Sequence, residues 1–279
     1  MTHHTFTHRL TRLALTGAIA LPLVLGATAC SDDDDTADTA TTTTVVEGNS
    51  AKGSNTAFCD GFVAVDAALG KLMGGGDAPP DPAAVEDART KIEAVRDAAP
   101  DDIADTLGTV ADQTLDRLEN PQGGPSEDFD AKYGEVVDWI DGNCGFGKLD
   151  VTAEDYHYMG IPEKAEAGKT TVHLSNKGTE MHEMVIFRIS DDVTAPVEKL
   201  LELPEEEMGG KIEMKGAAFA MPGAEAATTV DLEAGRYAVV CFIPVGSTPE
   251  AMEQAGPNSA PPEGPPHFAQ GMVHEMTVA

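Results

Sequence analysis

The sequence predicts a two-domain protein in which an N-terminal all-α helical bundle is followed by an all-β sandwich. Two observations carry this prediction. Apolar residues recur at spacings of three and four up to about residue 141, and short alternating runs replace that pattern after Lys148. The length of 279 residues also exceeds that of one average domain.

Residues 1–29 have the profile of a secretory signal peptide. A basic stretch without acidic residues precedes a short apolar run at 13–27, which is too short to serve as a permanent membrane-spanning helix. Small residues before Cys30 resemble the lipobox of bacterial lipoproteins, although Ala27 stands where that motif usually has leucine. The resemblance implies that Cys30 is lipidated and anchors the protein at the extracytoplasmic face of the cell membrane, with plain secretion as the alternative.

Residues 30–55 are expected to form a tether that begins at the lipidated cysteine. Asp, Thr, Ala and Ser dominate this segment, and almost no large apolar residue is available to offset the entropy lost on ordering. We therefore expect a disordered, acidic and Thr-rich linker that lets the folded part stand off the membrane.

Residues 56–147 are expected to form a four-helix domain. Apolar residues recur every three or four positions, and Gly- or Pro-rich breaks fall at 74–80, at Pro100 and at 120–125. In an up-down bundle, the start of the first helix and the end of the fourth lie at the same end.

The four cysteines have different settings along the chain. Cys59 and Cys144 bracket the helical segment, so the up-down order predicts a disulfide between them. A redox-active pair is less favoured because the CxxC spacing is missing. Cys241 then has no mate in a chain bound for an oxidising compartment, and a leftover thiol there needs a chemical reason.

Residues 151–279 are expected to form the sandwich. About seven short apolar runs bounded by turns suit such a fold. The strands that read most clearly are 170–174, 184–189, 227–232, 236–242 and 271–278. The acidic stretch 196–208 is expected to add a short helix without a site.

Four residues of this part supply the ligand types of a blue-copper centre. His182 precedes one predicted strand, Cys241 ends another, and His267 and Met272 lead into the last. Two imidazoles and a thiolate suit both copper oxidation states, with a thioether as a weak axial ligand. Each residue alone is more often structural, and only their combination favours a metal. Zinc is less favoured because a thioether is not among its usual ligands.

The order of these residues resembles the plastocyanin and azurin branch of the cupredoxins over nearly all of 151–279. The matching pieces are Asn176 before His182, Leu232–Tyr237 leading to Cys241, Pro244 after it, Pro266-His267, and Gly271-Met272. The resemblance implies a cupredoxin-like Greek-key sandwich, copper as the cofactor, and the ligand set His182, Cys241, His267 and Met272. It also implies that His267 lies near the surface and offers the electron path.

One departure from the family concerns the distance between the last ligands. Typical members have only a few residues between the ligand cysteine and the second histidine, whereas Val245 to Pro266 intervenes here. Cys241 and His267 can still meet if this insert bulges outward, because the entropic cost of closing a loop grows only logarithmically with its length.

Charge narrows the choice of partners. Acidic residues number 48 against 18 basic ones, giving a net charge of −30, which repels nucleic acid and favours basic protein partners. The leading hypothesis is one-electron transfer to a redox protein by a chain that is not an enzyme. Copper storage or delivery, with a copper donor or acceptor, and a metal-free binding module are the alternatives. Multicopper oxidase chemistry is disfavoured because the relevant strands hold no HxH pair.

Overall fold

The structure, a computed structural model, describes residues 55–73, 80–120, 126, 128–255, 262 and 264–279. The predicted signal segment, Cys30 and all but the last residue of the predicted tether lie outside the described residues. Within the described ranges, no helix has the length and apolar character needed to span a membrane. The helices and the strands fall within one compact unit, Val45–Ala279, and their division into separate domains stays a prediction.

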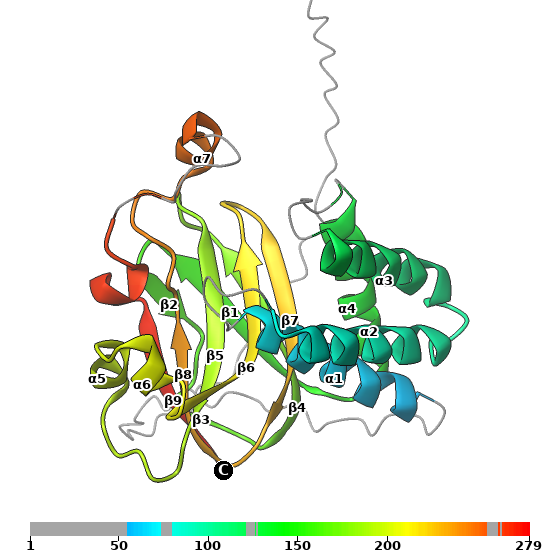
Figure 1. Cartoon of the computed structure of the whole chain (residues 1–279), viewed down its shortest axis with the longest axis horizontal. Coiled ribbons are helices and arrows are strands. Elements are labelled where there is room, and N and C mark those ends of the chain that lie inside the picture. Colours follow the sequence, from blue (N-terminus) through cyan, green and yellow to red (C-terminus); the bar gives the residue numbers. More distant parts are fainter. Residues whose placement is uncertain (1–54, 74–79, 121–125, 127, 256–261, 263) are drawn as a thin grey trace, which may run out of the picture. The chain divides into compact units, whose positions relative to one another are not determined.

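The N-terminal part contains the expected helices, and their breaks fall where the sequence places them. They are α1 (Thr56–Met73), α2 (Pro82–Asp97), α3 (Ala104–Glu119) and α4 (Phe129–Asn143) (Figure 1). The carboxylate of Asp81 accepts a hydrogen bond from the Ala83 amide and so caps the start of α2. The apolar faces of the helices meet in one core, which includes Phe58, Phe62, Ile92, Leu107, Val136 and Ile140.

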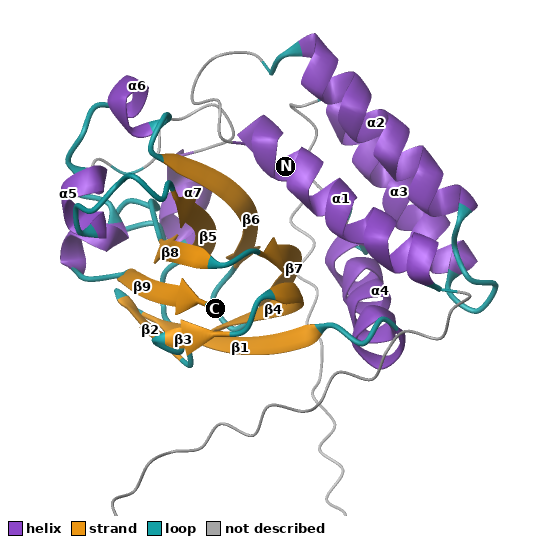
Figure 2. Cartoon of the chain, turned by 90° about the horizontal axis from the view of Figure 1, so that it is seen from below, coloured by secondary structure: helices purple, strands orange, loops and turns teal. Residues whose placement is uncertain are grey.

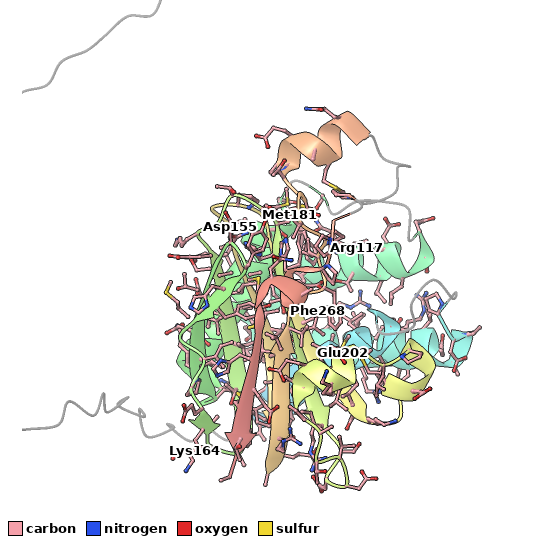
Figure 3. All side chains as sticks on the ribbon, turned by 90° about the vertical axis from the view of Figure 1, so that its left-hand side faces the viewer. Arg117, Asp155, Lys164, Met181, Glu202 and Phe268 are labelled. Atoms are coloured by element: carbon pink, nitrogen blue, oxygen red, sulfur yellow. A yellow bond between two sulfur atoms is a disulfide. The ribbon has the colours of Figure 1, made fainter. Side chains whose placement is uncertain are left out.

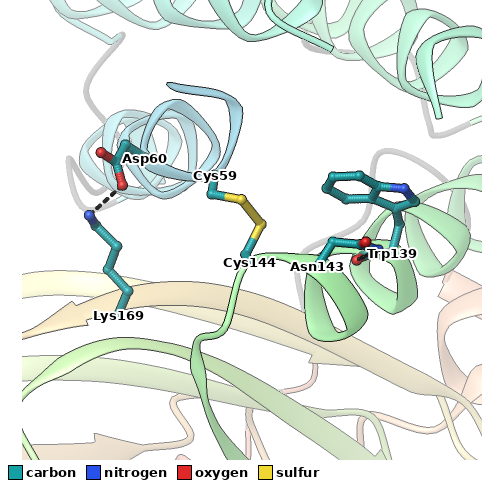
Figure 4. The surroundings of a disulfide bond; sticks show 6 residues. All are labelled: Cys59, Asp60, Trp139, Asn143, Cys144 and Lys169. Carbon is teal, nitrogen blue, oxygen red and sulfur yellow. Dashed lines mark hydrogen bonds and ion pairs between the residues drawn. A yellow bond between two sulfur atoms is a disulfide. The ribbon is translucent and has the colours of Figure 1, made fainter. Parts of the chain in front are cut away.

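A disulfide joins Cys59 to Cys144, which confirms the predicted pairing (Figure 4). The two Cα atoms lie 5.6 Å apart, with Cys59 in the first turn of α1 and Cys144 directly after α4. Near this bond the Trp139 ring packs edge-on against Phe58, with 5.2 Å between the ring centroids. The disulfide therefore closes the helical core at the end where the chain enters the strands.

The strands form two sheets, in the orders β2-β1-β4-β7 and β3-β9-β8-β5-β6. Because β8 returns beside β5 after β6 and β7, the connection is of the Greek-key kind. Five strands confirm the sequence prediction: β4 (Gly168–Asn176), β5 (His182–Ile189), β7 (Glu225–Leu232), β8 (Gly235–Val240) and β9 (Val273–Val278). Four others are not among the strands predicted from the sequence: β1 (Gly147–Glu154), β2 (His157–Met159), β3 (Lys164–Ala165) and β6 (Ile212–Ala220).

Short helices occupy the connections around the second sheet. The acidic stretch 196–208 holds α5 (Val197–Leu201) and α6 (Glu205–Met208), as expected, and the insert after Cys241 holds α7 (Pro249–Ala255). A 3-10 helix, η1 (His267–Gln270), leads towards β9. Residues of α5 cover the outer face of the second sheet, where Val197 and Leu200 join the buried cluster of Val185, Phe187, Ala238 and Val240.

The sandwich core lies between the two sheets. Alternate residues of β5 and β8 point into it, as period-two strands require, and they meet residues of β4 and β7. Its fully buried members include Leu174, Met184, Ile186, Val230, Tyr237, Cys241 and Met272. Cys241 and Met272 thus belong to a dry core, which limits the access of water to them.

Helix α1 lies against β6 and β7 (Figure 2). Its polar side chains bond to residues of the sandwich. The carboxylate of Asp66 accepts hydrogen bonds from both the amide and the hydroxyl of Thr229, at 2.7 Å each. Burial raises the pKa of Asp66 to about 6, although the bonds from Thr229 oppose that rise. A second link joins His173 of β4 to Asp141 of α4, with 2.9 Å between Nε2 and the carboxylate.

Candidate metal centre

Three side chains predicted as ligands meet at one end of the sandwich. His182 is the first residue of β5, Cys241 follows β8, and His267 opens η1. Their ligand atoms all lie within 4.8 Å of one another, and no other such group of three His, Cys, Asp or Glu residues was found in the described part of the chain. All three side chains are fully buried. Their role as ligands remains a prediction.

Backbone pairing explains why residues so distant in sequence meet. Antiparallel pairing of β5 with β8 matches Val185 to Val240, so the start of β5 lies beside the end of β8. Two hydrogen bonds then fix η1 against the chain after β8. The His267 amide donates to the Ile243 carbonyl at 2.8 Å, and the Phe268 amide donates to the Cys241 carbonyl at 2.9 Å.

The two imidazoles turn the same nitrogen towards the thiol. His182 Nδ1 lies 3.1 Å from His267 Nδ1, which lies 3.3 Å from Cys241 Sγ. The opposite nitrogens face carboxylates, with His182 Nε2 at 3.3 Å from Asp155 Oδ1 and His267 Nε2 at 3.1 Å from Glu180 Oε2. An ionised carboxylate only accepts hydrogen bonds, so each Nε2 carries the hydrogen and each Nδ1 presents a lone pair. Two lone pairs and a sulfur converge, which is the arrangement that a soft cation fits.

The pKa values of the cluster follow from burial. Burial lowers the pKa of His182, which keeps this imidazole in the neutral form that binds metals. Burial raises the pKa of the Cys241 thiol to about 12, so the thiol holds its proton until a cation displaces it. Burial opposes ionisation of Asp155 and Glu180, but the hydrogen bonds that each accepts outweigh it and lower both pKa values.

Met272 is tied to the same site through its main chain. Its amide donates to the His267 carbonyl at 3.1 Å, and its carbonyl accepts from the Cys241 amide at 3.2 Å. The side chain is fully buried in the sandwich core. Its role as a weak axial ligand stays a prediction.

The expectation that His267 lies near the surface is wrong. Its side chain is 0% exposed, the Tyr156 ring packs edge-on against it at 5.0 Å between centroids, and Glu180 holds its outer nitrogen. The physical reason is that Tyr156 and Glu180 pack against the ring, and the amides of Gly246 and Ser247 in the insert hold Glu180 there. The route to solvent through the imidazole edge, which the family resemblance implies, is closed here.

Sequence reasoning missed the residues around the ligands. Asp155 and Tyr156 follow β1, which pairs in parallel with β4 so that Ala153 lies opposite Asn176. This pairing brings the turn after β1 to the loop that precedes His182, and Figure 3 shows Asp155 and Met181 at one end of the sandwich with Lys164 at the other. Because β1 is not among the predicted strands, Asp155 could not be placed beside His182 from the sequence. For Glu180 the available signal was its position two residues before His182.

The loop before His182 is shaped by Asn176 and Gly178. The buried Asn176 amide group donates to the carbonyls of Glu180 and Ala220, at 2.9 Å each. A Cβ atom on Gly178 would lie 2.4 Å from Asp155 Oδ1 and 2.7 Å from His182 Nε2. Only glycine therefore allows the backbone to pass so close to this carboxylate–imidazole pair.

The fold and the site define a β-sandwich with a buried His-Cys-His cluster. The chain is similar to three solved auracyanins, each matching 47% of this chain with a TM-score of 0.29. The auracyanin from Roseiflexus castenholzii is 20% identical over 96% of its own length, and auracyanin B is 16% identical over 88% of its own length. Auracyanin A from Chloroflexus aurantiacus, a "blue" copper protein, is 10% identical over 98% of its own length. No protein-family model matches the chain, and no curated protein matches its sequence. These likenesses are too weak to define a family, so the chemistry rests on the site's own geometry.

Proposed function

We propose that this protein is an extracytoplasmic type 1 copper protein that transfers single electrons and is not an enzyme. One observation carries the proposal: two imidazole lone pairs and a thiol sulfur converge within 4.8 Å in a buried site. Imidazole and thiolate together suit copper, whereas oxygen-ligand cations such as Mg²⁺ and Ca²⁺ would find no carboxylate in this set. Copper supplies the redox step when bound, by alternating between Cu(I) and Cu(II).

The chain's own residues would hold and shield this ion. His182 and His267 offer Nδ1, Cys241 offers its sulfur, and Met272 is the candidate axial thioether. Burial of all four side chains excludes water, and carboxylates at the outer nitrogens fix both rings. A site supported in this way has little freedom to rearrange when the charge of the ion changes.

Storage or delivery of copper is the second candidate. It requires the ion to enter and leave readily, and the full burial of His182, Cys241 and His267 argues against rapid exchange. The net charge of −30 favours a basic partner in either case, a redox protein for electron transfer or a copper donor or acceptor for storage and delivery. Attachment through lipidated Cys30 would place the exchange at the outer face of the membrane.

An absorption titration tests the proposal. Mature protein and the Cys241→Ser variant are titrated with Cu(II), and voltammetry follows on the loaded protein. We expect an intense visible band from the sulfur-to-copper transition in the wild type only, with a reversible one-electron wave. A band that persists in the variant, or loaded protein without a reversible wave, would reject electron transfer at this site. No copper binding at all would favour the metal-free binding module.

A further inference from the structure

The two carboxylates that face the histidines differ in their surroundings. The Asp155 side chain is 35% exposed, whereas the Glu180 side chain is 10% exposed. Asp155 bonds to one segment, the loop that leads to His182, through the amide and hydroxyl of Thr179, the amide of Glu180 and the His182 ring. Glu180 instead connects segments that are far apart in sequence.

Four groups from three segments bond to the Glu180 carboxylate. Oε1 accepts from the Tyr156 hydroxyl at 2.7 Å. Oε2 accepts from the amides of Gly246 and Ser247, at 2.6 and 3.1 Å, and lies 3.1 Å from His267 Nε2. Two of these partners belong to the beginning of the insert and one is a predicted metal ligand. A single carboxylate therefore joins the insert to the ligand histidine.

The insert leaves the sandwich through residues 244–247 and rejoins it through residues 264–266. These two paired segments are called the neck. Pro244 pairs with Pro266, and the Val245 amide donates to the Pro265 carbonyl at 2.9 Å. The neck is also bound to the loop that carries Glu180, because the Met181 amide donates to the Ser247 carbonyl at 2.9 Å. It is packed tightly, since a Cβ atom on Gly264 would lie 2.2 Å from the Val245 carbonyl oxygen.

We infer that Glu180 is a positioning residue that clamps the neck over His267 and so closes the copper site against solvent and exchange. The predicted effect on copper exchange rests on the proposed function. The hydrogen bonds that make up the clamp are present without metal. Removing the carboxylate would take the acceptor from the Gly246 amide, leave the Ser247 amide only its 3.3 Å bond to the Pro244 carbonyl, and leave the His267 ring without its outer partner. Loss of such an outer partner typically weakens metal binding by about 10- to 100-fold.

Hydrogen exchange of the metal-free mature protein tests the clamp directly. We expect Glu180→Ala to speed exchange of the Gly246 and Ser247 amides by about tenfold or more, since each loses a bond to a charged acceptor. Glu180→Gln keeps the shape and one acceptor oxygen, so it should fold as the wild type does and show a smaller increase. Glu202→Gln, at the exposed residue that directly follows α5, is the matched control and should leave both amides unchanged.

Release of copper to a chelator tests the consequence. Glu180→Ala should lose Cu(II) to excess EDTA about 10- to 100-fold faster than the wild type. Asp155→Ala should leave the hydrogen-exchange rates of the Gly246 and Ser247 amides unchanged, because Asp155 does not bond to the neck. Neck amides that exchange as in the wild type in Glu180→Ala, or that respond equally to Asp155→Ala, would overturn the clamp. Failure of the proposed function is a different outcome: wild-type protein would bind no copper through Cys241 while the exchange result stood.

Discussion

His182 and His267 face each other through equivalent nitrogens, with their Nδ1 atoms 3.1 Å apart inside the sandwich. With both outer nitrogens bonded to carboxylates, the thiol hydrogen of Cys241 is the one proton available among the three inner atoms. The close approach of the two rings is therefore satisfied by a cation better than by the protein alone. Substitution of a residue that orients either ring should therefore change the affinity of the protein for copper.

Replacing Gly178 by alanine should disturb His182. The new methyl group would collide with Asp155 Oδ1 and His182 Nε2, at 2.4 and 2.7 Å, so the imidazole must lose its carboxylate or move. We expect copper affinity to fall by about tenfold and the free energy of unfolding to fall by about 1–3 kcal/mol. Competition with a chelator and urea unfolding measure the two effects. Gly210→Ala is the control, because no atom lies within 4 Å of its added Cβ; equal behaviour of both variants would contradict the prediction.

Tyr158 should tune the reduction potential. Its hydroxyl donates to the Glu183 carbonyl and lies within reach of the Cys241 sulfur. Because a hydroxyl has one hydrogen, we expect it to turn from the carbonyl to the sulfur when copper displaces the thiol proton. A donor near the sulfur stabilises the more negative sulfur of the reduced site, so Tyr158→Phe should lower the potential. A net hydrogen bond of about 1 kcal/mol corresponds to about 40 mV for one electron. Voltammetry of the loaded variant checks this, and an unchanged or higher potential would show that the hydroxyl does not act on the sulfur.

Removing the disulfide should destabilise the protein without removing the metal site. The bond closes a loop with a sequence separation of 85, for which the chain-entropy model gives about 4.6 kcal/mol. We expect the Cys59→Ser/Cys144→Ser variant to unfold at lower urea concentration and to keep its Cys241-dependent copper band. A reductant should shift the unfolding of the wild type by a similar amount and leave the variant unaffected. Unfolding curves that coincide would refute the prediction.

Asp66 should make stability depend on pH. Its pKa is about 6 in the folded protein, above the 3.8 of the free group, so the folded state holds its proton more tightly than the unfolded state. Stability from this group is therefore present below about pH 4 and lost as pH rises through 6. We expect Asp66→Asn to gain stability relative to the wild type by about 1–3 kcal/mol between pH 4 and pH 7. Urea unfolding at several pH values measures the difference, and a constant difference would disprove the raised pKa.

The sequence contained enough to predict the helices and their disulfide. Helical periodicity with clear Gly- and Pro-rich breaks defines α1 to α4, and the up-down order places Cys59 beside Cys144. The strands were harder. β1 does alternate, with Leu149, Val151 and Ala153 between polar residues, but it begins inside the segment 56–147 that the sequence assigns to helices. β6 alternates only over 212–215 before small residues follow, and β2 and β3 are too short to show any period.

The ligand candidates could be found from residue type and order, but their surroundings could not. Cys241 and His267 meet where the two sides of the neck pair, at Pro244 and Pro266, and no local pattern reveals this pairing or the bonds from the neck to Glu180. Asp155 reaches His182 only through the parallel pairing of β1 with β4. Such long-range pairing has no local signature in the sequence. The family resemblance implied an exposed His267, and the contacts that bury this side chain could not be predicted.

The neck also separates the spacing of the ligands along the chain from their spacing in space. Pro244 and Pro266 are already paired before the chain continues into the segment 248–262, so the ends of that segment are held together whatever its sequence or length. This segment is therefore an insertion whose two ends join the sandwich at neighbouring positions. We expect that peptides of different length or chemistry can replace this segment, as recognition elements or sensors, while His182, Cys241 and His267 keep their relative positions.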